Sequence, residues 1–227
     1  MRDVSKIIIL ALCLGLTFSL SGDSKKDPPD NDQKEQKKIN NIIVDTQKKE
    51  IRLRCKLAIT SGILEFFLVT ESGRTYESVL KIAENKPSEL HFALLLLGFE
   101  PLPFPEYSEI LKNLKKADLN KYKKSLLKIR LLHKDKAVSL PSILKYREAD
   151  DIGNLQWVFT GTPFSKDNKY MGDYSDIFIS IWPDETGVIN LLSQAGNPYR
   201  GDFGYEVKSD SDFSVDDNFE VIITGVE

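Results

Sequence analysis

The sequence predicts an α+β fold in the form of a β-rich single domain, and three observations support this class. Many short apolar stretches either alternate with polar residues or end at turn residues, as β-strands do. One segment, 88–97, has the apolar content and the flanking residues of a buried central helix. Strands and helices do not alternate regularly, and no repeat of solenoid length is present, which argues against doubly wound and repeat architectures.

The N-terminal residues 1–21 are expected to form a signal peptide. Arg2 and Lys6 provide a positively charged start, and fourteen uncharged residues, 7–20, follow. This run is shorter than the roughly 20 apolar residues that a membrane span needs. An uncleaved membrane anchor and a buried strand are the alternatives. The residues that follow resemble a lipoprotein box in which Asp23 replaces the lipidated cysteine, so lipidation is not supported.

The segment 22–38 is expected to be a disordered polar tether, because residues 23–38 include no aliphatic or aromatic side chain. The folded domain would then span 39–227, which is long enough to bury a core unaided. Export predicts a periplasmic, envelope-associated or secreted protein. After cleavage Cys55 would be the only cysteine, which leaves no internal disulfide.

The predicted strands come in two groups. The stretches 51–59, 63–69 and 75–82 are expected to form a small meander, with 41–44 before it. The alternation in 51–59 places Cys55 on the apolar face, as a buried hydrophobe rather than a nucleophile. Later strands are expected over 126–132, 157–160, 177–182 and 219–224.

The helix 88–97 is expected to begin after Ser88 as N-cap and to end before Gly98. Apolar residues lie on every side of it, so burial on all sides is predicted. Beyond three prolines, residues 106–124 carry apolar side chains at helical spacing with lysines between them. This segment predicts a lysine-rich helical insertion.

The composition excludes several classes of function. The sequence has no dinucleotide-binding, P-loop, serine-hydrolase elbow or zincin motif. It also has no Cys-x-x-Cys motif. The net charge of −3 argues against a nucleic-acid-binding protein. Two histidines and two cysteines leave little for metal clusters or thiol chemistry, and no cofactor is expected.

His91 is the candidate on which any catalytic hypothesis depends. A histidine in the first turn of a helix beside strands could face Glu65 or Glu77, with Asp173 as a further carboxylate. Such a pair serves proton transfer or metal ligation. The alternative is a structural histidine that binds the backbone or one carboxylate. His133 is expected on an exposed turn.

Basic residues are concentrated in 111–136, which holds ten Lys or Arg and two Asp. Lys115, Lys116, Lys123 and Lys124 are the candidates for contact with anionic lipid, cell-wall polymer or, least expected, nucleic acid. The alternative is a solvated helix face that complements the acidic C-terminus.

The spacing of Asp210, Asp212 and Asp216 resembles a calcium-binding loop. An EF-hand loop, however, requires Gly and Glu where this sequence has Val215 and Val221. A solvated acidic loop is the simpler interpretation.

Several segments together resemble a known family. The string 88–101, SELHFALLLLGFEP, is similar to the hallmark helix of the YdjY-type domain, an exported bacterial family. Looser similarity covers 62–78, 157–164 and 170–180, and the resemblance extends over about 42–224. The family commonly has His-Glu where this chain has Tyr76-Glu77. The resemblance implies an exported domain and no particular reaction.

These observations predict a non-enzymatic binding or assembly module of the bacterial cell envelope. Its partner would be an envelope protein or an anionic polymer, and not nucleic acid. Contact with a membrane is expected only through the N-terminal segment, if that segment is uncleaved. The alternative is a hydrolytic or metal-assisted enzyme centred on His91 with nearby carboxylates.

Overall fold

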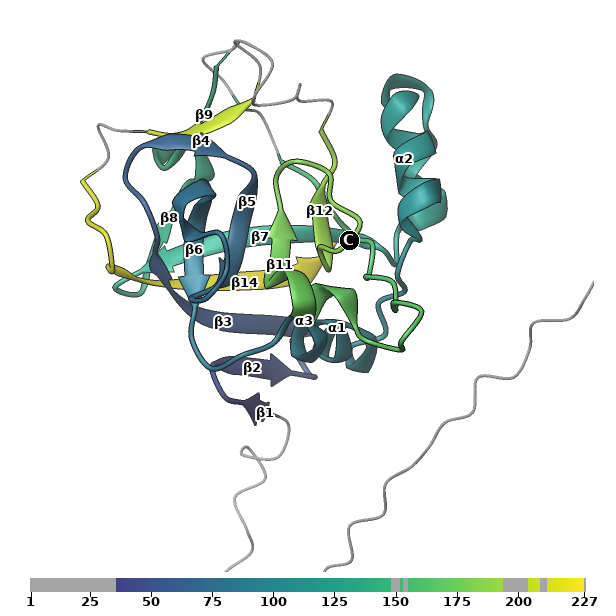
Figure 1. Ribbon diagram of the computed structural model, residues 1–227, viewed down its shortest axis with the longest axis horizontal. Helices are drawn as coiled ribbons and strands as arrows, with labels where there is room; N and C mark the ends of the chain where they lie inside the picture. The colour runs from purple at the N-terminus through teal and green to yellow at the C-terminus, as the bar shows by residue number, and fades with distance from the viewer. Residues whose placement is uncertain (1–35, 148–151, 153–154, 194–203, 209–211, 227) are drawn as a thin grey trace, which may run out of the picture. The chain divides into compact units, whose positions relative to one another are not determined.

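Eight strands close into a barrel, which is the main feature of the fold (Figure 1). The computed structural model describes residues 36–147, 152, 155–193, 204–208 and 212–226. Around the barrel the strand order is β3, β14, β7, β10, β12, β11, β5, β6, and β6 pairs again with β3. The barrel strands are β3 (Glu50–Leu57), β5 (Phe66–Thr70), β6 (Ser78–Ile82), β7 (Leu126–His133), β10 (Trp157–Phe159), β11 (Ile177–Ser180), β12 (Ile189–Leu191) and β14 (Asn218–Gly225).

Shorter elements surround this barrel. The strands β1 (Gln36–Ile39) and β2 (Ile42–Asp45) extend the sheet beyond β3, and β8 (Lys136–Val138) pairs with β7. A separate sheet contains β4 (Gly62–Leu64), β13 (Tyr205–Val207) and β9 (Leu144–Tyr146). The helices are α1 (Pro87–Leu96), α2 (Phe104–Lys112) and α3 (Met171–Ser175), with 3₁₀ turns η2 (Thr75–Glu77), η3 (Leu114–Lys116), η4 (Leu119–Tyr122) and η5 (Leu140–Ser142). None of the helices in the described ranges is long and apolar enough to cross a membrane.

The core lies inside the barrel and follows directly from the period-2 alternation of its long strands. Leu53 of β3 pairs with Val221 of β14, which pairs with Leu131 of β7, and all three are buried. Successive residues of a strand point to opposite faces, so the intervening charged residues point outward. Cys55 is buried on the same face of β3, as the alternation predicts.

The predicted β-rich α+β composition is confirmed, whereas the closed barrel was not part of the prediction. The predicted meander over 51–82 is wrong. Residues 63–69 divide into β4 and β5, which belong to different sheets. In addition, β5 and β6 pair in parallel, and it is β6 that pairs with β3. A meander requires each strand to pair antiparallel with the next one. Here the connection between β5 and β6, which includes the 3₁₀ turn η2, lets these two strands pair in parallel.

The helix α1 is present, but its predicted burial on every side is wrong. Leu90, Ala93 and Leu94 face the core, whereas Phe92 and Leu95 are exposed. The N-cap is Lys86 rather than Ser88, and its N–H donates to the Glu89 side chain over 3.0 Å. The helix therefore lies on the outside of the barrel and buries one face only (Figure 1).

The lysine-rich segment 106–124 is helical, as predicted, but interrupted: α2 is followed by η3 and η4. Tyr107 anchors it, since its hydroxyl donates to the Leu191 carbonyl over 2.7 Å. A second small core forms around this side chain. The strand β1 begins at Gln36, before the expected domain start at residue 39. The predicted signal peptide 1–21 and most of the predicted tether 22–38 lie outside the described residues.

Candidate functional site

A recess of about 780 Å³ gathers basic side chains from separate parts of the chain, and we call it the basic groove. The turn between β2 and β3, the end of α1, the segment after η4, and strands β7 and β14 all contribute to it. Leu97, Gly98 and Phe99 provide an uncharged wall. The basic lining residues are Lys48, Lys49, Lys123, Lys124, Lys128 and Arg130.

Local structure explains why the basic side chains of the β2–β3 turn and of β7 point outward. The Asp45 carboxylate accepts the Lys48 N–H over 2.9 Å and so closes the turn, and Lys49 has a left-handed φ of 50°. On β7 the buried Leu127 and Ile129 alternate with the exposed Lys128 and Arg130. The strand β14 brings these two groups together, because Thr224 pairs with both Glu50 and Lys128.

Gly225 allows the apolar wall to pack closely against the groove. A Cβ at this position would lie 3.0 Å from a ring carbon of Phe99. The ring therefore rests against backbone, and a larger residue at 225 would displace it. The end of α1 is held against β14 in this way.

The charges of the groove are only partly neutralised. Glu50 is the acidic lining residue, and its side chain is shared by Arg130 at 3.0 Å and Arg52 at 2.7 Å. Lys124 pairs with Glu100 at the rim, 2.5 Å away. Among the described residues, the other lining lysines make no ion pair closer than the 3.9 Å contact between Lys48 and Asp45. The groove thus retains a strong excess of positive charge.

The predicted lysine cluster is divided by the structure. Lys123 and Lys124 line the basic groove, whereas Lys115 and Lys116 lie in η3 and are exposed outside it. The contribution of Lys48 and Lys49 was missed. The sequence contains the signal only as a Lys-Lys-Glu turn, and nothing local indicates that this turn meets residue 123.

His91 does not meet the predicted carboxylates. Its Nδ1 lies 2.6 Å from the Tyr170 hydroxyl, and its ring packs edge-on against Phe159. Burial lowers the pKa of His91. Burial and the charge of Asp173 raise the pKa of Tyr170. Gly161 has a φ of +66°, and a Cβ there would lie 3.1 Å from His91 Cε1. In the part of the chain that the structure describes, His91 makes no ion pair with a carboxylate.

Asp173 has a structural task at the start of α1. Its two oxygens accept the N–H and the hydroxyl of Ser88, each over 2.8 Å. Backbone N–H groups in the first helical turn have no partner within the helix, so this carboxylate satisfies one of them. Asp173 therefore joins α3 to α1 and is not free for chemistry at His91.

Glu65 and Glu77 do come together, in a cluster of their own. The Glu65 N–H donates to the Glu77 carbonyl over 3.0 Å, and Arg74 Nη1 lies 2.8 Å from Glu65 Oε2. Burial, followed by the hydrogen bond and the charge of Glu77, raises the pKa of Glu65 to about 7. The Glu65 carboxyl therefore binds its proton more tightly than an ordinary glutamate does. His91, Tyr170 and Asp173 thus belong to the packing of α1 against α3, whereas Glu65 and Glu77 belong to a separate cluster.

Among the described residues, the candidate carboxylates of the acidic C-terminal segment do not come together. Asp210 lies outside the described residues, and Asp212 is exposed. Asp216 binds Lys81 over 2.7 Å, and this hydrogen bond lowers the pKa of Asp216. Within the described ranges, no group of three or more His, Cys, Asp or Glu side chains could hold a metal ion.

Comparisons with protein-family models, with curated proteins and with solved structures find no match for this chain. The resemblance to the YdjY-type family therefore stays a prediction.

Proposed function

We propose that this protein is a non-enzymatic binding module whose basic groove holds an anionic partner. The observation that carries the proposal is the convergence of six basic side chains from distant segments on one recess, opposite a single acidic lining residue. A solvated charged face needs no such convergence. Exposed cations in a concave surface attract and retain anions, since the low-dielectric wall focuses their field.

The proposal keeps the expected setting of the cell envelope, where anionic polymers and anionic lipids are available. It includes no metal, no cofactor and no nucleic acid. The enzyme alternative would need His91 to meet Glu65 or Glu77, and the contacts described for His91 are instead with Tyr170 and Phe159. Glu65, paired with Arg74, is not among the residues that line the basic groove.

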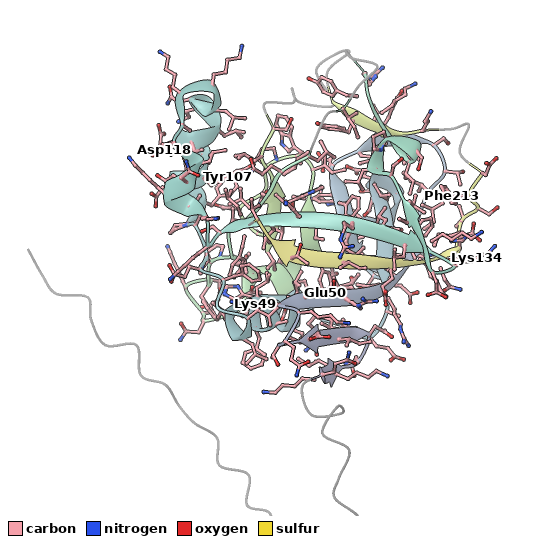
Figure 2. The ribbon with its side chains drawn as sticks, turned by 180° about the vertical axis from the view of Figure 1, so that it is seen from behind. Lys49, Glu50, Tyr107, Asp118, Lys134 and Phe213 are labelled. Atoms are coloured by element: carbon pink, nitrogen blue, oxygen red, sulfur yellow. The ribbon has the colours of Figure 1, made fainter. Side chains whose placement is uncertain are left out.

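Binding of inorganic polyphosphate to the full chain, measured by calorimetry at two salt concentrations, tests this proposal. The double variant Lys49→Gln/Lys123→Gln removes two groove charges and should weaken binding by roughly tenfold. The control Lys134→Gln/Lys136→Gln removes equal charge at the opposite end of the long strands, as Figure 2 shows for Lys134. Binding should also weaken as salt rises. Equal losses in both double variants would show that net charge, and not the groove, is responsible.

A further inference from the structure

Three apolar side chains on the outer face of α1 are in contact with solvent, and we call them the α1 apolar stripe. Phe92 is 57 % exposed, Leu95 46 % and Leu96 36 %. Their spacing of three and four residues places them on one face of the helix. Single exposed apolar residues are ordinary, but large ones grouped on successive turns indicate an interaction surface.

Along the chain, the stripe is followed directly by residues that line the basic groove. The helix α1 ends after Leu96, and the next residues, Leu97, Gly98 and Phe99, form the uncharged wall of that groove. Gly98, with a φ of +83°, turns the chain there. One end of α1 therefore presents apolar side chains next to Lys48, Lys49, Lys123 and Lys124.

This combination constrains the chemistry of the partner. A soluble polyanion would satisfy the lysines and would leave the stripe in water. An apolar protein surface would cover the stripe and would leave the lysines without counter-charges. The surface of an anionic bilayer satisfies both, because its headgroups attract lysines and its acyl boundary accepts shallowly inserted Phe and Leu side chains.

We propose that the α1 apolar stripe and the basic groove together dock this domain on the surface of an anionic lipid bilayer. The inference rests on the proposed function and names the partner of the same groove. It departs from the expectation that membrane contact would involve only the N-terminal segment. Each lysine at the surface strengthens the partition by roughly fivefold, so lysines and stripe reinforce each other.

Sedimentation of the full chain with vesicles of phosphatidylcholine, with and without phosphatidylglycerol, tests the inference. Residues 1–35 are then the same in every sample. The variant Phe92→Gln/Leu95→Gln should bind the anionic vesicles about tenfold more weakly and should keep its affinity for polyphosphate. Val215→Gln, at a residue 49 % exposed on another segment, is the matched apolar control and should bind normally. Circular dichroism confirms that each variant is folded.

The variant Lys49→Gln/Lys123→Gln should weaken vesicle binding by roughly 25-fold and should weaken polyphosphate binding as well. Unchanged vesicle binding by the stripe variant would overturn the bilayer inference while leaving the proposed function standing. If Lys134→Gln/Lys136→Gln weakened polyphosphate binding as much as Lys49→Gln/Lys123→Gln, the result would instead count against the proposed function. A change from dimer to monomer in the stripe variant, with vesicle binding retained, would assign the stripe to self-association and also overturn the inference.

Discussion

The Glu65 carboxyl makes the stability of the fold dependent on pH in a defined direction. Burial and the neighbouring Glu77 raise the pKa of Glu65 from 4.5 to about 7. The folded protein therefore holds this proton more tightly than the unfolded chain does. The contribution of Glu65 to the free energy of unfolding falls as pH rises from about 4.5 to about 7 and is constant above that range.

The size of the effect follows from the same pKa. Each pH unit between the two values corresponds to about 1.4 kcal/mol, so the full fall is on the order of 3 kcal/mol. The Glu65 side chain is 12 % exposed, and solvent screening reduces the fall below this value. The charge of Arg74 lowers the pKa of Glu65, but burial and Glu77 outweigh it.

Urea unfolding of the Glu65→Gln variant at pH 5 and pH 8 measures this contribution. Glutamine cannot ionise, so the difference in unfolding free energy between the two pH values should shrink by about 2–3 kcal/mol. Loss of the Arg74 contact affects both measurements similarly and largely cancels in the difference. Glu71→Gln, an exposed position on the same connection between β5 and β6, should leave the pH difference unchanged. An unaltered pH difference in Glu65→Gln would refute the reasoning.

Two further predictions concern the other networks. Asp173→Ala should lower the free energy of unfolding, measured by thermal unfolding, by about 1–2 kcal/mol, because the Ser88 N–H and hydroxyl both lose their acceptor. Ser88→Ala removes only the hydroxyl bond and should lower it by about half as much. Equal stability of Asp173→Ala and the unmodified chain would contradict the role of Asp173 at the start of α1. In the variant Cys13→Ser, which leaves Cys55 as the one cysteine, the Cys55 thiol should resist maleimide until the protein is unfolded, because burial raises its pKa far above the usual range. Rapid labelling of this variant in the folded state would show that β3 is open to solvent.

The sequence was most informative where the local pattern of apolar residues directly reflects which side chains are buried. Alternation along β3 and β7 predicted their inward faces correctly, including the position of Cys55, because a strand with one buried face has a period of two. The helix α1 was found for a similar reason. Its N-cap was predicted wrongly, because Lys86 caps the helix, whereas Ser88 binds Asp173, 85 residues away along the chain.

The site could not be predicted from the sequence because its parts meet only through barrel closure. Lys49 and Lys123 reach the same recess because β14 lies between β3 and β7, and no local signal indicates that strand order. The sequence likewise did not indicate that His91 would contact Tyr170 rather than Glu65. Proximity in predicted elements does not indicate which side of a closed sheet each side chain faces.

The net charge of −3 conceals how the charges are used in the folded protein. Several carboxylates are engaged internally: Glu50 holds two arginines, Asp173 holds the start of α1 and Asp216 holds Lys81. The groove lysines have few such partners among the described residues, so a slightly acidic chain presents a basic face. Net charge governs solubility and long-range attraction, whereas binding depends on charge left without an internal partner. A near-neutral composition therefore argues against a chain built mainly to coat nucleic acid and is compatible with a recess that holds anions.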